Sequence, residues 1–140
     1  MANNTTAAKS KGRILVEWLT TTDHKKIGYL YLITSVIYFV IAGVMALVIR
    51  AQLAAPGLEI VASKEQYNQL FTMHASVMIF WVIIPFLAAF GNYVVPLMIG
   101  APDMALPRMN NWSFWILPFA FILLASTLFM EGGGPNFGWT

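Results

Sequence analysis

The sequence predicts an all-α integral membrane protein with three membrane-spanning helices. Of its 140 residues, 59% are hydrophobic and only 10% are charged, whereas about 25% are charged in a typical soluble protein. Three runs, 27–49, 70–99 and 112–130, contain no Asp, Glu, Lys or Arg, and each approaches or exceeds the roughly 20 residues needed to cross a bilayer. A soluble helix would instead repeat a polar face with the helical period.

The N-terminal segment, 1–26, is basic and is expected on the cytoplasmic side of the membrane. Its residues 11–22 mix charges with apolar side chains and Trp18, which predicts either a short interfacial helix or an ordinary lead-in to the first span. Either Thr22 or Asp23 is a candidate N-cap for that span, which is expected at 27–50. The chain has no cysteine, which excludes disulfides, thiolate metal sites and thiol nucleophiles.

The second span is expected at 66–99, after an outer loop at 51–65. Ser63 followed by Gln66 is a candidate capping box at its start. The third span is expected at 112–131.

Two further connections complete the topology. A compact polar connection, 100–111, precedes the third span, and a glycine-rich segment, 132–140, follows it. Lys and Arg gather in the N-terminal segment and in 100–111. By the positive-inside rule both are cytoplasmic, so the outer loop and the C-terminal segment lie on the opposite side.

His74 is the only histidine inside a predicted span, and an ionisable side chain at that depth is a functional-site hypothesis by default. Neutral imidazole is a good axial ligand for haem iron, so two interpretations stay open: an iron ligand, or a hydrogen bond to a neighbouring helix. Arg50 either snorkels to the interface or donates to a polar haem substituent. Tyr67 lies two turns before His74 on the same helical face and could reach the same group.

Asp103 and two asparagines form a second group of candidates. Asp103 lies between prolines in the second connection, with Asn110 nearby and Asn92 inside the second span. An acid at a membrane mouth with amides leading inward suits proton uptake along ordered water. The alternative is a solvated loop acid beside helix-capping asparagines.

Five stretches resemble the large subunits of the haem–copper oxidases, in the same order and with plausible spacing. They are TDHK at 22–25, FTMHA at 71–75, GNY at 91–93, VPLMIGAPDMALPRMNN at 95–111 and FGWT at 137–140. The resemblance implies that His74 is one axial ligand of a low-spin haem, expected to be a-type. It also implies that Arg50 contacts the haem formyl group with Tyr67 nearby, and that Trp139 lies near the haem propionates.

The same resemblance implies that Asp103 is the inner mouth of a proton channel in which Asn92 and Asn110 hold water. The whole protein would be the catalytic large subunit of a respiratory oxidase that takes electrons from cytochrome c, reduces O2 to water and pumps protons. Such subunits are bundles of about twelve membrane-spanning helices. This chain resembles the first three.

Much of the chemistry would therefore lie outside this segment, which carries no catalytic residue of its own. The second axial His, the second haem and the copper ligands belong to later helices. The implied partners are the rest of subunit I, a copper-bearing subunit II, subunit III, cytochrome c and membrane lipid, with no nucleic acid. The implied membrane is the bacterial plasma membrane or the mitochondrial inner membrane.

Three alternatives compete with this interpretation. Quinol-using relatives carry charged or His residues where this sequence has Ile41, Met45 and Gln66, which favours cytochrome c over a quinol as donor. A non-catalytic membrane haem protein would normally pair two intramembrane histidines. A transporter segment with Asp103 as its gate would need no haem.

Overall fold

The computed structural model describes residues 10–57 and 60–139, and over these ranges the chain is helical with no strand. The all-α prediction is thus confirmed for this part of the chain. The expectations for residues 1–9, 58–59 and Thr140 lie outside it. In chain order the elements are α1 (Lys11–Leu19), α2 (His24–Gln52), α3 (Lys64–Val77), the π-helical segment η1 (Met78–Ile83), α4 (Ile84–Met98), α5 (Pro107–Ser126) and the 3-10 turn η2 (Thr127–Phe129).

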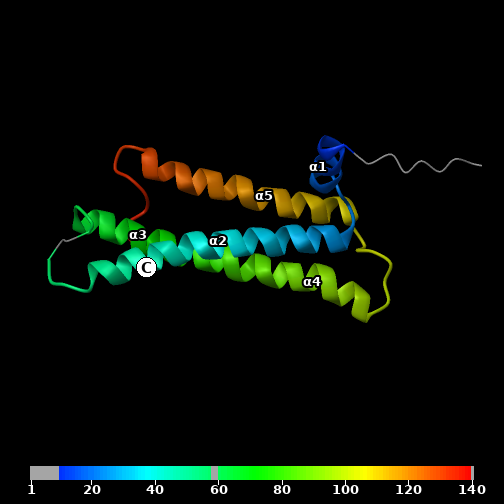
Figure 1. The fold of residues 1–140 in the computed structure, drawn as a ribbon, viewed down its shortest axis with the longest axis horizontal. Helices are drawn as coiled ribbons and strands as arrows, with labels where there is room; N and C mark the ends of the chain where they lie inside the picture. Colours follow the sequence, from blue (N-terminus) through cyan, green and yellow to red (C-terminus); the bar gives the residue numbers. More distant parts are fainter. Residues whose placement is uncertain (1–9, 58–59, 140) are drawn as a thin grey trace, which may run out of the picture.

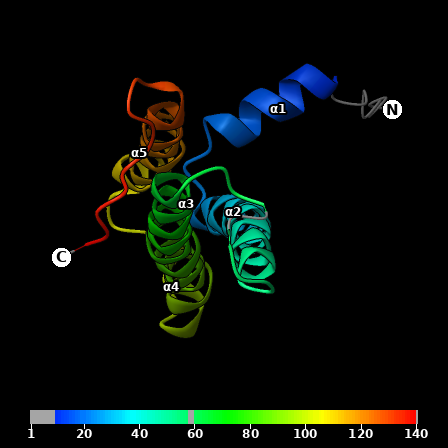
Figure 2. The ribbon, with the colours of Figure 1, turned by 90° about the vertical axis from the view of Figure 1, so that its left-hand side faces the viewer.

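The three long helices lie side by side along one axis (Figure 1). α3, η1 and α4 form one continuous rod, and the view along the axis shows this rod flanked by α2 and α5, with α1 leaving the bundle at an angle (Figure 2). Successive helices run in opposite directions. We call the end where α2 begins and α4 stops the Asp23 end, and the end where α2 stops and α3 begins the Arg50 end.

Each of the three helices is long and apolar enough to cross a membrane. The mean hydropathy of the most apolar window is 2.6 for His24–Gln52, 2.0 for Lys64–Met98 and 1.8 for Pro107–Phe129. Most of their large apolar side chains are exposed in this part of the chain, as expected for helices whose outer surroundings are lipid or further helices.

Capping explains where two of the helices begin. The Asp23 carboxylate accepts a hydrogen bond of 2.9 Å from the Lys25 backbone N–H, so α2 starts three residues before the expected boundary. The Ser63 hydroxyl accepts from the Gln66 N–H at 3.1 Å, and the Gln66 amide oxygen accepts in return from the Ala62 N–H at 2.7 Å. This exchange is a variant of the capping box expected there.

Prolines shape the two other spans. α5 begins at Pro107, before the expected 112, because proline has a fixed φ suited to the first helical position and lacks only an N–H that has no partner there. Asn110 therefore lies in the first turns of a helix rather than in a connection. In the rod, Pro85 is the second residue of α4, just after η1. Since Pro85 cannot donate to the carbonyl of Trp81, the wider π turn accommodates its ring.

Two buried clusters hold the helices together. Near the Asp23 end, Ile27 and Tyr31 of α2 pack with Ala89 of α4 and Phe114 of α5. The second cluster lies further along the axis and joins Tyr38 and Ala42 of α2 to Val77 and Trp81 of the rod, with side chains of α5 against them. The second cluster fixes α2 against the part of the rod that carries His74.

Candidate functional site

The His74 ring is held by a backbone carbonyl of the neighbouring helix. Its Nδ1 lies 2.9 Å from the carbonyl oxygen of Ala42 in α2, and Ala42 is fully buried. Because a carbonyl oxygen can only accept, Nδ1 carries the proton and donates. In the neutral ring the lone pair is therefore on Nε2, which is the tautomer that a metal ligand requires.

Nε2 of His74 has no hydrogen-bond partner within 10–57 and 60–139. Every buried side-chain nitrogen or oxygen in these ranges has a partner, so the unpaired Nε2 is accessible at the surface of the three-helix bundle. The hydrogen bond to α2 accounts for one ring nitrogen and leaves the other available. The ring thus fits an axial ligand. Elsewhere in the described chain, no three His, Asp or Glu side chains gather as a metal site.

Arg50 and Tyr67 lie at the same level of the bundle, and within 10–57 and 60–139 no hydrogen bond joins their side chains. Arg50 is eight residues beyond Ala42 and Tyr67 seven residues before His74, so each lies about 10–12 Å nearer the Arg50 end than the His74–Ala42 contact. Tyr67 shares a helical face with His74, as predicted from the spacing. Arg50 is exposed.

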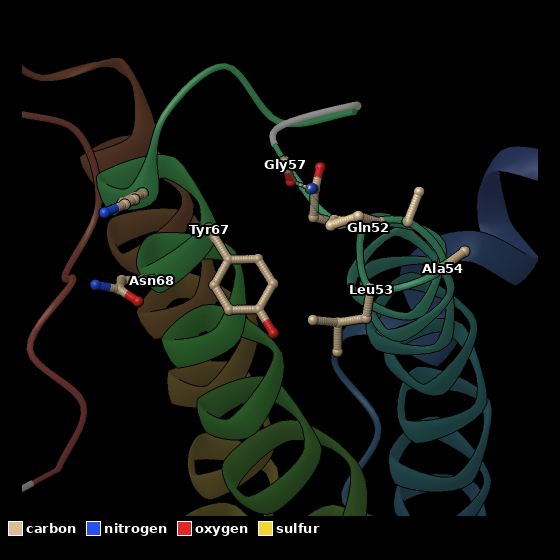
Figure 3. A pocket seen from close by; sticks show the side chains of 9 residues that line it. Gln52, Leu53, Ala54, Gly57, Tyr67 and Asn68 are labelled. Atoms are coloured by element: carbon tan, nitrogen blue, oxygen red, sulfur yellow. Dashed lines mark hydrogen bonds between the residues drawn. The ribbon is translucent and has the colours of Figure 1, made fainter.

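Tyr67 lines a cleft of about 570 Å³ between the end of α2 and the start of α3. Figure 3 shows its ring directed across the cleft toward Leu53. Lys64 and Asn68 contribute to the α3 side. Tyr67 therefore has open space in front of it, and Arg50 is not among the lining residues.

Gln52 fixes the loop that forms the other wall of this cleft. Its side chain is 5% exposed. The amide nitrogen donates to the carbonyl of Gly57 at 2.6 Å, and the amide oxygen accepts from the N–H groups of Ile60 and Val61 at 2.9 Å each. All three groups are loop backbone, so one buried amide determines the path of the connection.

Trp139 approaches the rod close to the level of His74. Its indole N–H donates to the Ser76 hydroxyl at 3.3 Å, and its ring stacks on Phe80 with centroids 5.3 Å apart. Gln69 donates to the carbonyl of Gly132 at 3.1 Å, so the C-terminal segment runs along α3 (Figure 2). Ser76 follows His74 by two positions and hence lies on a different face of the helix.

The predicted amides are joined at the Asp23 end. Asn92 is 7% exposed, donates to the Ala88 carbonyl at 2.9 Å and accepts a short hydrogen bond from the side-chain amide of Asn110. The backbone carbonyl of Asn92 accepts from Nδ1 of His24 at 2.7 Å. His24, at the start of α2, is only 2% exposed.

Two residues that sequence reasoning did not identify extend this polar group: Ser113, which is exposed, and Tyr31, which is buried. The Ser113 hydroxyl donates to the Asn110 carbonyl at 2.7 Å. Since its proton is thereby used, Tyr31 donates its own hydroxyl proton to Ser113 across 2.9 Å. The spacing of Asn110 and Ser113 on one helix was a usable signal. Nothing in the sequence pairs Tyr31 with them, because Tyr31 lies 82 residues before Ser113.

Asp103 is not joined to the amides by a hydrogen bond within the described ranges. Its carboxylate accepts from the adjacent Met104 N–H at 2.7 Å, and the side chain is partly exposed. Asn111, next to Asn110, turns to a different partner and donates to the Thr21 carbonyl at 2.8 Å. The geometry thus unites Asn92 and Asn110 and leaves Asp103 at the surface of the same end.

A family of known proteins matches most of this chain. The sequence model of the family described as cytochrome c and quinol oxidase polypeptide I matches residues 26–140, which include α2 from Lys26 onward, α3 to α5 and each site residue predicted from the sequence. The chain belongs to this oxidase polypeptide I family. Together with its three apolar helices, this membership makes the chain an integral membrane protein.

Several relatives in the family are bacterial. The chain is 52% identical over 128 residues to a putative cytochrome c oxidase subunit 1-beta of Streptomyces avermitilis, covering 91% of this chain and 23% of the relative. It is 44% identical over 135 residues to cytochrome c oxidase subunit 1 of Corynebacterium diphtheriae, covering 96% of this chain and 24% of the relative. The chain therefore spans about a quarter of the length of the curated relatives that it matches.

Proposed function

We propose that this chain is the N-terminal part of the catalytic large subunit of a cytochrome c oxidase. The names of relatives at about half identity support this proposal, as does the absence of charged quinol-site residues at Ile41 and Met45. The whole complex would reduce O2 to water with electrons from cytochrome c and pump protons. Its other parts would be the rest of subunit I, a copper-bearing subunit II and subunit III. Turnover with a quinol but not with cytochrome c would contradict the choice of donor.

The proposed role of His74 is to bind the iron of a low-spin, a-type haem through Nε2. The observation that supports it most is the hydrogen bond from Nδ1 to the Ala42 carbonyl. Such a bond selects the ligating tautomer, fixes the ring orientation and increases the basicity of Nε2. When bound, the haem supplies a one-electron carrier, and copper and a second haem would be bound by later helices.

Three further side chains are proposed to contact the haem periphery. Arg50 and Tyr67 would donate to a polar substituent on the side of the Arg50 end, where both lie at one level of the bundle and Tyr67 faces an open cleft. Trp139 would lie near the propionates. The family resemblance supports this assignment, and the bond to Ser76 holds the indole near the level of His74, on a different face of the helix.

At the Asp23 end we assign proton uptake from the cytoplasmic side of the bacterial plasma membrane. Asp103 would collect protons at the surface. The amides of Asn92 and Asn110 and the hydroxyls of Ser113 and Tyr31 would hold water in line from that surface, because each offers a donor or an acceptor and Asn92 and Tyr31 are buried in an apolar bundle.

The haem assignment is tested with His74→Ala in the assembled complex. We expect loss of the low-spin haem absorption and of one haem in a pyridine haemochrome assay. His24→Gln is the matched control, since His24 donates to a carbonyl at the other end of the bundle, and we expect its spectrum to be unchanged. Intact low-spin bands in His74→Ala would refute the assignment.

The proton assignment is tested separately with Asp103→Asn. We expect slower turnover and loss of proton pumping, with haem absorption unchanged because Asp103 lies at the opposite end from His74. Normal pumping in this variant would contradict the proton assignment and favour the alternative that Asp103 is a solvated loop acid.

A further inference from the structure

Pro96 deprives one backbone carbonyl of its usual partner inside α4. The proline lies within the helix and is buried. In an α-helix each carbonyl accepts a hydrogen bond from the N–H four residues later, and proline has no N–H. The carbonyl that loses its donor is therefore that of Asn92, four residues before Pro96. A carbonyl left without a donor in apolar surroundings destabilises the fold.

His24 of α2 supplies the missing donor. Its Nδ1 lies 2.7 Å from the carbonyl oxygen of Asn92, and both residues are buried. A carbonyl oxygen only accepts, so Nδ1 carries a proton and donates. This N–H is present in the neutral tautomer that the contact selects and in the protonated ring alike. The hydrogen bond therefore requires no change in the charge of the imidazole.

Close packing of α2 and α4 brings the ring to this carbonyl. Gly28 follows His24 by one turn on the same face of α2. A Cβ added to Gly28 would lie 3.2 Å from the carbonyl oxygen of Ala89 and 3.2 Å from Cβ of Tyr93, which is closer than an ordinary van der Waals contact. A larger residue would thus push the two helices apart. Gly28 keeps them near enough for His24 to reach across.

The residue whose carbonyl His24 holds also supplies one of the two paired amides. The side chain of Asn92 donates to the Ala88 carbonyl at 2.9 Å and accepts from the side chain of Asn110. Asn92 therefore has partners on α2, on its own helix and on α5. Without the bond from His24, the backbone of Asn92 would lose its hydrogen bond to α2, and its amide would be less firmly placed.

We propose, on the basis of the proton path assigned above, that His24 is a positioning residue that holds Asn92 where its amide meets Asn110. The imidazole replaces the backbone N–H that Pro96 lacks, and it does not itself carry the proton. Sequence reasoning did not find this pairing, because His24 and Asn92 are 68 residues apart on different helices.

The test measures the rate of proton uptake by the assembled, reconstituted complex after rapid oxidation, with haem absorption as the assembly control. His24→Leu removes the donor and keeps a branched side chain. We expect it to slow uptake about three- to tenfold, the effect of losing one buried hydrogen bond. His24→Asn should stay within about twofold of wild type, because its amide nitrogen is a donor at the same number of bonds from the backbone as Nδ1.

A double variant tests the role of Pro96. Pro96→Ala restores an N–H four residues after Asn92, so uptake in His24→Leu/Pro96→Ala should return toward the wild-type rate. Pro118→Ala is the matched control, because it restores an N–H inside α5 and should not rescue His24→Leu. If His24→Leu alone fails to assemble, haem absorption becomes the measured quantity: its recovery with Pro96→Ala supports the pairing, and continued loss overturns it.

The reference variant Asn92→Ala separates this role from the proton path. Slow uptake in Asn92→Ala with normal uptake in His24→Leu would overturn the positioning role and leave the path intact. Normal uptake in Asn92→Ala would contradict the path, and the positioning role with it. If His24→Asn is as slow as His24→Leu, the imidazole acts by carrying a proton, which an amide cannot do, and positioning is overturned. A double variant with Pro96→Ala that stays as slow as His24→Leu would also overturn it.

Discussion

The contact between Asn92 and Asn110 gives the sharpest test of the proton assignment, because the two amides lie on different helices and share one hydrogen bond. The variants are Asn92→Ala, Asn110→Ala and the double variant. If the amides hold the same file of water, removing either one interrupts it. A second removal then has little left to disrupt.

The expected size follows from the energy of one such bond. An interhelical hydrogen bond in a membrane contributes about 0.6 kcal/mol on average, and a typical buried one contributes at most about 1.5 kcal/mol. If the loss appears as a barrier to proton transfer, each single variant slows proton uptake about three- to tenfold. Asn92→Ala should be the slower one, since it also loses the bond to Ala88. The double variant should match Asn92→Ala, whereas independent effects would multiply to about ten- to a hundredfold.

The assay is the rate of proton uptake by the reconstituted complex after rapid oxidation, with haem absorption as the assembly control. Asn111→Ala is the matched variant, because Asn111 is the neighbouring amide but donates to Thr21 instead. We expect its rate to stay within about twofold of wild type. Multiplicative losses in the double variant, or an equal loss in Asn111→Ala, would refute the shared path.

Two other predictions concern packing. Trp81→Phe removes the 2.9 Å hydrogen bond from the indole to the Leu117 carbonyl. It should lower the free energy of unfolding by about 1–2 kcal/mol, measured by denaturant titration of the complex. An unchanged midpoint would show that this bond does not stabilise the rod against α5. Gly133→Ala adds a Cβ that collides with the Gln69 side chain at a position with φ of 75°, so it should release the C-terminal segment to protease more than Gly132→Ala does, since Gly132 has open space around it. Gln69→Ala should partly restore protection, and no restoration would mean that backbone strain alone is responsible.

The membrane-spanning helices could be predicted from the sequence because lipid imposes a single strong requirement. A long run of uncharged residues has few other interpretations in a soluble protein. The three runs correspond to the three long helices. The helix ends are less predictable, since they depend on local chemistry. The Asp23 cap extends α2, and Pro107 starts α5 earlier than its apolar run does.

The contacts of the candidate site also fall into those that the sequence predicts and those that it does not. Spacing along one helix placed Tyr67 on the face of His74, because a period of seven residues is two turns. Contacts between helices could not be predicted, since they depend on which faces meet. The bond from His74 to Ala42 spans 32 residues, and that between Tyr31 and Ser113 spans 82. No local pattern encodes either pairing.

The central claim is that the His74 imidazole binds iron through Nε2, and ligand rescue tests it most directly. The measurement is the low-spin haem absorption of assembled His74→Gly, recorded before and after addition of free imidazole. We predict that the band is lost in the variant and returns with imidazole, which can occupy the space left by the side chain. A band that is present without imidazole would contradict the account.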